Sequence, residues 1–269
     1  MAGEFRNIKL FLFDMDGTLY LGDRLYDFTP ELLRTIRESG RRYMFMTNNS
    51  SKSVRAYIEK LAKLGIAATE EDFITSSQAT ARYLQANHAG QRLYVCGTAS
   101  LKEELSRAGF ALTESVEDTD CIVMGFDTEL NFKKLHDISY MLCTRPGIPY
   151  IATNPDYVCP TEFGSVPDCG SVCDMLYNVA KRRPVVIGKP EPRMPEIAME
   201  MTGYTKEETA VIGDRIYTDV KSGLRAGCLA VLVMSGETDE AILAASFEKP
   251  DLVLEDASLI LPDLKETER

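Results

Sequence analysis

The feature that most constrains the fold is a repeated alternation of short apolar runs with longer segments of helical character. The first run, Ile8–Phe13, is continuously apolar and ends at Asp14, which is typical of a central parallel strand covered on both faces. Further strands are expected at Arg41–Met46, Arg92–Cys96, Cys121–Met124, Pro149–Ala152, Val185–Ile187, Thr209–Ile212, Leu229–Val233 and Leu252–Leu254. Helices are expected at Pro30–Ser39, Lys52–Leu64, Ala79–Ala86, Ala99–Ala108, Asn131–Thr144, Gly170–Arg182, Pro192–Met201 and Tyr217–Ala226, with a frayed charged tail at Pro262–Arg269. This alternation predicts an α/β fold.

Length and charge limit the classes of function. The chain has 269 residues, which predicts one large or two modest domains, and its 45% hydrophobic content suffices for a buried core. Its formal net charge of −11, without a local Lys/Arg-rich run, disfavours nucleic acids and anionic membrane surfaces as partners. A phosphorylated substrate would also be repelled, so its binding site must supply a local cation.

The chain lacks signals for a membrane or for export. No apolar run approaches the roughly 18 residues of a membrane span, and the polar segment Met1–Lys9 does not resemble a signal peptide, so a cytoplasmic protein is expected. The seven cysteines are scattered without a Cys-x-x-Cys pair, which predicts reduced, mostly buried thiols. The two histidines, His88 and His136, fall in helix-like stretches, which argues against a histidine-based zinc site or a Ser-His-Asp triad.

Two carboxylates follow the first predicted strand. Residues two apart in an extended chain point to the same side, so Asp14 and Asp16 are expected to present paired carboxylates. They lie at the carboxyl end of a central strand, where open α/β sheets bind ligands. Gly17 supplies the turn. The alternative is an Asx-rich turn in which Asp14 serves only as a cap.

Polar clusters also follow two other strands. Thr47–Asn49 offers a hydroxyl and amide donors that suit phosphate oxygens, although Asn49 or Ser50 could equally cap the next helix. Gly188–Pro190 places the single cation Lys189 after a strand, and its alternative is a solvated surface lysine.

A fourth cluster, Gly213–Asp219, brings Asp214 and Asp219 after the strand Thr209–Ile212. Taken alone, these carboxylates could serve as ordinary helix N-caps. Because the carboxyl ends of parallel strands lie at one edge of a sheet, the four clusters together predict a single crevice. Such a crevice would combine carboxylates, one ammonium group and amide donors.

These four segments resemble the motifs of the haloacid dehalogenase-like hydrolase superfamily, which appear here in the correct order as DMDGT, TNN, GKP and GDRIYTD. The TNNSS form of the second motif, the long insert before Lys189 and the segment Ala152–Asp156 are similar to the NagD-like branch, which includes 4-nitrophenyl phosphatases, nucleotide monophosphatases and pyridoxal phosphatases. Pro167–Gly170 departs from the Pro-Gly-x-Gly turn of many relatives, which obscures the substrate subgroup but not the chemistry.

The resemblance implies a Mg²⁺-dependent phosphatase with a covalent intermediate. Asp14 would be the nucleophile, Asp16 the general acid and base, and the metal ligands would be the side chains of Asp14 and Asp214 and the main-chain carbonyl of Asp16. Attack of a carboxylate on a phosphate dianion at about 4 Å costs about 8 kcal/mol at an effective dielectric constant of about 20, so cations are required. An oxygen-only ligand set selects Mg²⁺.

The remaining motif residues are assigned by the same resemblance. Thr47, Asn48 and Lys189 would bind the phosphoryl oxygens, and Asn49 and Asp219 would support the residues that contact metal or phosphate.

The resemblance also implies a Rossmann-like core at 1–78 and 183–269, with a smaller α/β cap domain inserted at 79–182. The cap would exclude water and select the leaving group of a small phosphorylated metabolite such as a nucleotide, sugar, pyridoxal or aryl phosphate. A homodimer through the cap is compatible with the family. Two alternatives stay open at this point: a phosphomutase or phosphotransferase on the same core, and a non-catalytic binding protein of this fold.

Overall fold

The computed structural model describes residues 3–161 and 163–265, which form two compact units. The core unit contains the described residues up to Thr47, the segment Val54–Ile74 and the described residues from Lys189 on. The insert unit contains Asn48–Ser53 and Thr75–Gly188. Each unit has its own sheet and its own apolar cluster, so the predicted α/β fold class is confirmed.

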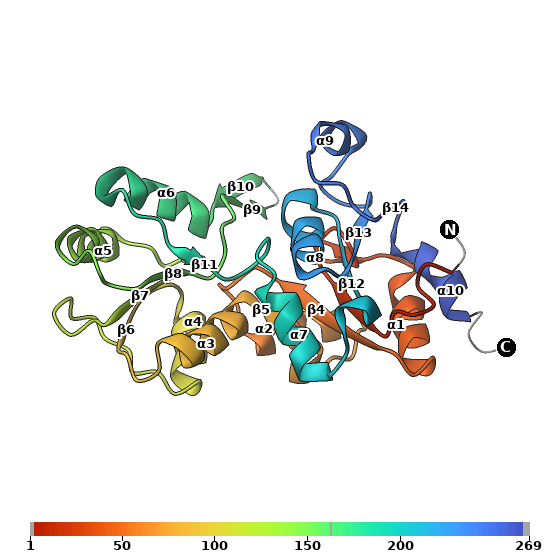
Figure 1. Cartoon of the computed structure of the whole chain (residues 1–269), viewed down its shortest axis with the longest axis horizontal. Helices are drawn as coiled ribbons and strands as arrows, with labels where there is room; N and C mark the ends of the chain where they lie inside the picture. Colours follow the sequence, from red (N-terminus) through yellow and green to blue (C-terminus); the bar gives the residue numbers. More distant parts are fainter. Residues whose placement is uncertain (1–2, 162, 266–269) are drawn as a thin grey trace. The chain divides into compact units, whose positions relative to one another are not determined.

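The core unit is built on a sheet that has six strands in the described part of the chain, in the order β14-β13-β12-β1-β4-β5 (Figure 1). The strands are β1 (Leu10–Phe13), β4 (Arg42–Thr47), β5 (Phe73–Thr75), β12 (Thr209–Gly213), β13 (Leu229–Val233) and β14 (Leu252–Leu254). Strand β1 pairs in parallel with β12 and β4, so that Leu12 lies opposite Val211 and Met44. The carboxyl ends of β1, β4 and β12 therefore share one edge of the sheet.

Helices cover both faces of this sheet. Successive residues of a strand point to opposite faces, and those of β13 belong to two different apolar clusters. Val231 and Val233 pack with residues of α1, α2, η4 and α10, whereas Ala230 and Leu232 pack with η3 on the opposite face. The elements are α1 (Thr29–Glu38), α2 (Val54–Lys63), η1 (Glu70–Asp72), α7 (Arg193–Thr202), η2 (Lys206–Glu208), η3 (Ile216–Val220), α8 (Lys221–Ala226), α9 (Glu240–Ala245), η4 (Ala257–Ile260) and α10 (Leu261–Lys265).

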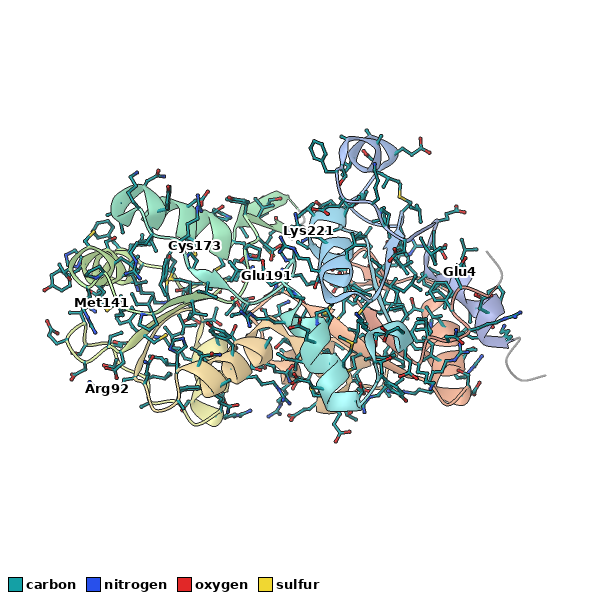
Figure 2. The ribbon with its side chains drawn as sticks, in the orientation of Figure 1. Glu4, Arg92, Met141, Cys173, Glu191 and Lys221 are labelled. Atoms are coloured by element: carbon teal, nitrogen blue, oxygen red, sulfur yellow. The ribbon has the colours of Figure 1, made fainter. Side chains whose placement is uncertain are left out.

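The insert unit carries a sheet that, within the described residues, has four strands in the order β11-β8-β7-β6. The elements are β6 (Leu93–Cys96), β7 (Cys121–Met124), β8 (Tyr150–Ala152), β11 (Val185–Val186), α3 (Ser76–Asn87), α4 (Ala99–Arg107), α5 (Phe132–Thr144) and α6 (Cys169–Ala180). Met141 of α5 and Cys173 of α6 belong to the cluster that covers one face of this sheet (Figure 2).

Two antiparallel hairpins escape the sequence prediction. One joins β2 (Tyr20–Leu21) to β3 (Arg24–Leu25) and the other joins β9 (Val158–Thr161) to β10 (Gly164–Pro167). Both are short and largely exposed, so neither shows the apolar pattern from which strands are predicted. Strand β5 and helix α9 were missed as well.

Several predicted boundaries are wrong. Helix α3 begins at Ser76 rather than Ala79, because Thr75 accepts a hydrogen bond from the Gln78 amide and caps it. The predicted frayed tail is helical up to Lys265, where α10 ends. Its buried Asp263 accepts hydrogen bonds from the amides of Gly3 and Phe5. Residues 266–269 of the predicted tail lie outside the described residues.

The compact units also differ from the expected division of the chain. The predicted insert 79–182 lies within the segment 75–188, but Asn48–Ser53 was expected in the core and belongs to the insert unit. Hydrogen bonds of Ser50 and Asn48 with insert residues account for this difference. All seven cysteines are free and five are buried. No described helix has the length and apolar character needed to cross a membrane.

Candidate active site

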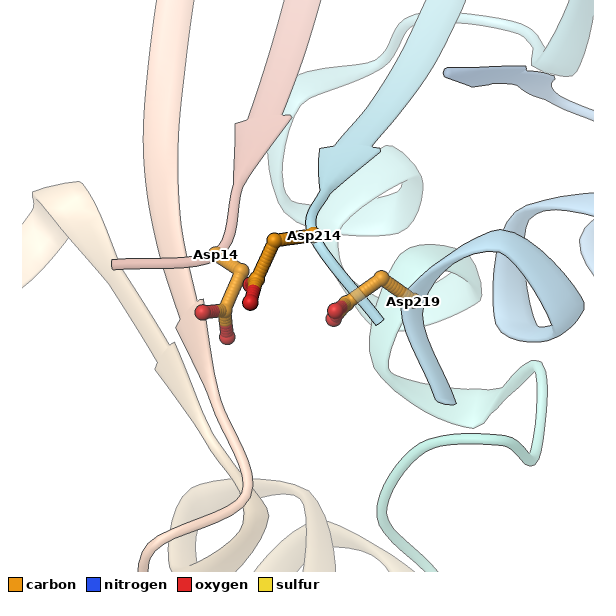
Figure 3. A group of neighbouring side chains, drawn as sticks. All are labelled: Asp14, Asp214 and Asp219. Carbon is orange, nitrogen blue, oxygen red and sulfur yellow. The ribbon is translucent and has the colours of Figure 1, made fainter. Parts of the chain in front are cut away.

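Asp14 follows β1 directly, and its position is fixed by the sheet. Its amide donates to the carbonyl of Ile212 at 2.8 Å, which extends the pairing of β1 with β12 by one residue. The side chain is 17% exposed, so the Asp14 carboxylate is partly accessible at the otherwise buried end of β1. Figure 3 shows its carboxylate beside that of Asp214, which follows β12.

Lys189 is the cation that this strand edge requires. Its side chain is 3% exposed, and its Nζ donates to Asp14 Oδ1 at 2.6 Å, to Asp219 Oδ1 at 2.5 Å and to the carbonyl of Met46 at 3.1 Å. Burial opposes the charge and would lower the pKa of Lys189, but the two carboxylates outweigh burial and raise the pKa above its ordinary value. The alternative of a solvated surface lysine is therefore wrong.

Asp214 is held from two sides. Its Oδ1 accepts a hydrogen bond from the Thr18 hydroxyl at 3.3 Å, and its Oδ2 accepts one from the Glu237 amide at 2.8 Å. Burial, together with the charges of Asp14 and Asp219, raises the pKa of Asp214 to about 7. Neither Thr18 nor Glu237 was singled out in the sequence, although Thr18 belongs to the DMDGT motif.

The carboxylates of Asp14, Asp214 and Asp219 form a cluster in which one oxygen of each lies within 4.8 Å of the others (Figure 3). Burial and the charge of Asp14 raise the pKa of Asp219 despite its ion pair with Lys189. Three carboxylates face one ammonium group here, and the nearby Arg215 is paired with Glu237 at 2.8 Å. The raised pKa values report an excess of negative charge that a divalent cation with oxygen ligands would balance.

Close packing around the carboxylates requires glycine. A β-carbon at Gly17 or Gly236 would overlap the Asp214 carboxylate, and one at Gly213 would overlap Asp219. Gly17 also has a positive φ of 87°, which other residues rarely adopt. These glycines let the main chain approach the acidic side chains closely.

Among the described residues, the carboxylate cluster does not include Asp16. Its residue is exposed, and its Oδ1 accepts a long hydrogen bond of 3.5 Å from the Gly22 amide of the β2–β3 turn. The surrounding protein limits hydration of the carboxylate and, with the charge of Asp14, raises the pKa of Asp16. The expectation that Asp14 and Asp16 present paired carboxylates needs correction, because the two side chains have different partners. Asp14 accepts from Lys189, and Asp16 accepts from Gly22 of a turn.

The TNN motif is divided between the two units. Thr47 ends β4 in the core unit and is buried. Asn48 belongs to the insert unit, where its Nδ2 donates to Asp156 Oδ2 at 2.8 Å. Asn49 Oδ1 accepts from the amide and the hydroxyl of Ser51 at 2.9 and 2.7 Å, which makes a local turn. No motif or spacing in the sequence indicated Asp156 as a partner of Asn48.

Comparisons with known proteins agree with the motifs. A family model described as haloacid dehalogenase-like hydrolase matches residues 11–111, and a model described as HAD-hydrolase-like matches residues 186–259. A 5′-nucleotidase, YutF of Bacillus subtilis, is 34% identical over 96% of this chain and 99% of its own length. An acid sugar phosphatase of Staphylococcus haemolyticus is 30% identical over 97% of this chain and 98% of its own.

Solved structures show the same likeness. The crystal structure of a 4-nitrophenylphosphatase from Thermotoga maritima superposes with a TM-score of 0.92, at 36% identity, and covers 98% of this chain and 100% of that one. NagD from Escherichia coli K-12 superposes with a TM-score of 0.85, at 28% identity, over 96% and 98% of the two chains.

Proposed function

This chain belongs to the haloacid dehalogenase-like hydrolases, and from that premise we propose that it is a Mg²⁺-dependent phosphatase that hydrolyses phosphomonoesters of small metabolites through a phosphoaspartate on Asp14. The relatives are named for phosphatase activity on nucleotides, sugars and 4-nitrophenyl phosphate, which supports this class of reaction. The observation that carries the proposal is the contact of 2.6 Å between Asp14 and the buried Lys189, beside two further carboxylates.

The acidic cluster suits Mg²⁺ because its donors are all oxygen atoms and its negative charge exceeds the nearby positive charge. The side chains of Asp14 and Asp214 and the main-chain carbonyl of Asp16 would hold the ion. Once bound, Mg²⁺ would neutralise part of the charge on the substrate phosphate and on these carboxylates. Asp219 accepts from Lys189 and from the Arg215 amide, so it serves to orient Lys189.

Asp14 performs the first chemical step. One of its oxygens attacks phosphorus, the bond from phosphorus to the leaving oxygen breaks, and an acyl phosphate forms. Lys189 donates a hydrogen bond to the carboxylate at 2.6 Å and offsets part of its charge as the phosphate approaches. Thr47 and Asn48, with Lys189, bind the phosphoryl oxygens, and Asn49 supports the turn that follows them.

Asp16 handles the protons. In the first step it donates its proton to the departing alkoxide, and in the second it takes a proton from the water that attacks the phosphoaspartate. Orthophosphate and free Asp14 result. A raised pKa favours the protonated form of Asp16 that the first step needs. Its hydrogen bond with the Gly22 amide of the β2–β3 turn keeps its carboxylate outside the acidic cluster and available to a leaving group.

The test is release of orthophosphate from a panel of nucleotide, sugar, pyridoxal and aryl phosphates, with Mg²⁺ or with EDTA. We expect release with Mg²⁺, and a loss of at least about 1,000-fold in kcat for Asp14→Asn because the nucleophile is gone. Asp23→Asn, which neutralises an exposed carboxylate of the core unit, is the matched control. Asp23→Asn should melt at the wild-type temperature, and circular dichroism should show that Asp14→Asn is folded under the assay conditions.

Other outcomes identify the alternatives. Phosphate that reappears on a second position or a second acceptor would indicate a phosphomutase or phosphotransferase. No metal-dependent release across the whole panel would indicate a non-catalytic binding protein. The insert unit as a cap that selects the substrate, a homodimer formed through it, and a cytoplasmic location stay predictions alongside this function.

A further inference from the structure

The amide of Asn48 is held by a carboxylate that no motif contains. Asn48 Nδ2 donates to Asp156 Oδ2 at 2.8 Å, and both residues belong to the insert unit. Asn48 directly follows Thr47, which ends a central strand of the core unit, so the chain itself keeps Asn48 next to that strand end. This inference rests on the proposed function, in which Asn48 binds a phosphoryl oxygen.

Asp156 is itself fixed by a buried asparagine. Asn154 is fully buried, and its Nδ2 donates to Asp156 Oδ2 at 2.8 Å and to Asp168 Oδ1 at 3.2 Å. Asn154 Oδ1 lies 2.8 Å from the Thr153 hydroxyl, so both ends of its amide are engaged and its orientation is set. Asp168 caps α6 through the Cys169 amide, which anchors the network to a helix of the insert unit.

The main chain of Gly188 packs against the side chain of Asn48. A β-carbon at Gly188 would meet Asn48 Oδ1 at 2.6 Å and the Thr153 carbonyl oxygen at 2.6 Å. The oxygen end of the Asn48 amide thus lies against the bare main chain of Gly188, and its nitrogen end lies on Asp156. The two ends meet chemically different partners.

We propose that Asp156 is a positioning residue, which fixes the Asn48 amide with its nitrogen in the orientation needed to donate to the substrate phosphate. An ionised carboxylate only accepts hydrogen bonds, so the atom of Asn48 that faces Asp156 must be the nitrogen. Its two hydrogens make donation to Asp156 compatible with donation to a phosphoryl oxygen. The opposite orientation of the amide would present its oxygen to an anionic group.

Asp156→Asn is the decisive variant, because an asparagine at 156 can either donate or accept and no longer selects one orientation of Asn48. We expect kcat/KM for 4-nitrophenyl phosphate to fall about 10- to 100-fold, the range of a hydrogen bond to a charged group. The inhibition constant of orthophosphate should rise by a similar factor. Asp118→Asn, which removes an exposed carboxylate of the same unit, should change neither quantity.

A double-mutant cycle separates positioning from a structural role. If Asp156 acts through Asn48, Asp156→Asn should have no further effect on kcat/KM in an Asn48→Ala background, whereas a merely structural effect would add. Asp156→Ser provides a second, smaller replacement should Asp156→Asn lower the melting temperature. Additive losses, or a wild-type affinity of Asp156→Asn for orthophosphate, would overturn the proposal.

The outcome is also separable from the proposed function. If Asn48→Ala alone leaves kcat/KM and orthophosphate affinity unchanged, Asn48 needs no positioning and this inference fails. The phosphatase proposal would then still stand on Mg²⁺-dependent release and on the loss caused by Asp14→Asn.

Discussion

At the residue scale, the environment of Lys189 decides how the acidic side chains can coexist. Removing an ammonium group from water is costly. The charged form of Lys189 is stable here because the carboxylates of Asp14 and Asp219 lie next to it. The same carboxylates repel Asp214, whose pKa rises in response. The pKa values of Lys189 and Asp214 therefore both rise: the carboxylates stabilise the charged form of the lysine, whereas burial and the neighbouring carboxylates destabilise the charged form of Asp214.

The role of Asp16 predicts a dependence on the leaving group. Asp16→Asn removes the proposed proton donor, and we expect a loss of roughly 100- to 10,000-fold when the leaving alkoxide is a strong base. 4-Nitrophenolate is a weak base that departs without protonation, so its phosphate ester should lose far less in the first step. The measurement is kcat/KM of wild type and variant for 4-nitrophenyl phosphate and an alkyl phosphate. Equal losses for the two substrates would contradict Asp16 as the acid.

The raised pKa of Asp214 predicts a coupling of Mg²⁺, pH and stability. In the unfolded chain this carboxyl loses its proton near its ordinary pKa, whereas in the folded protein it does so near pH 7. The ion-free protein therefore keeps this contribution to stability at low pH and loses it as the pH rises through about 7. Under the proposed function Mg²⁺ binds the ionised carboxylates, and it should then raise the melting temperature more at pH 8 than at pH 5.5.

The check is scanning calorimetry at both pH values with EDTA or excess MgCl₂. Asp214→Asn is the control, since without this carboxyl the difference between the two pH values should shrink. An equal Mg²⁺ effect at both pH values in the wild type would show that Asp214 does not titrate with the ion.

At the element scale, strand ends set the geometry and caps set the helix boundaries. Strands β1, β4 and β12 are adjacent and parallel, so the residues that follow them meet without any further device. Helix α3 begins where Thr75 and Gln78 form a capping box, with the Gln78 side chain accepting from the Thr75 amide at 2.9 Å.

The cap of α3 provides a stability test. Thr75→Ala removes the oxygen that accepts from the Gln78 amide, and we expect the free energy of unfolding to fall by about 1 kcal/mol. Thr69→Ala is the matched control: Thr69 caps the three-residue helix η1 at an exposed position and should cost less than about 0.5 kcal/mol. Urea denaturation gives both values, and equal losses would show that the α3 cap has no special weight.

At the scale of the whole molecule, the chain is divided into two units with separate apolar cores. The core unit buries clusters on both faces of its sheet, and the insert unit buries its own between β6–β8 and helices α5 and α6. Asp14, Lys189, Asp214 and Asp219 all belong to the core unit. A ligand of the acidic cluster should therefore stabilise one unit directly.

This division predicts two transitions in a calorimetric melt, of which Mg²⁺ raises one and leaves the other within about a degree. Asp14→Asn should weaken the effect on the first transition without moving the second. A single transition whose calorimetric and van't Hoff enthalpies agree would mean that the two units unfold as one, contrary to this expectation.

The sequence predicted most of the helices and longer strands and, with the resemblance of its motifs to a known family, the candidate residues of the core site. Continuous apolar runs such as Ile8–Phe13 report burial on both faces, and the polar residues after them occupy strand ends by virtue of chain order. Asp14 and Asp214 could therefore be expected to lie together. The same reasoning was wrong for Lys189, because the strand before it, β11, pairs with β8 in the sheet of the insert unit and not with the core sheet. The exposed hairpins could not be predicted, since their strands are short and carry no apolar pattern.

What the amino-acid order determined was local: which segments become strands or helices, and which charged groups stand at their ends. Only the tertiary structure decided which side chains become partners. Lys189 donates to Asp219, and the Gly22 amide donates to Asp16. Asn48 donates to Asp156 within the insert unit. These contacts depend on side-chain hydrogen bonds whose partners are chosen by three-dimensional proximity. The partner of Asn48 lies more than a hundred residues away in the chain, where no periodicity or spacing could indicate it.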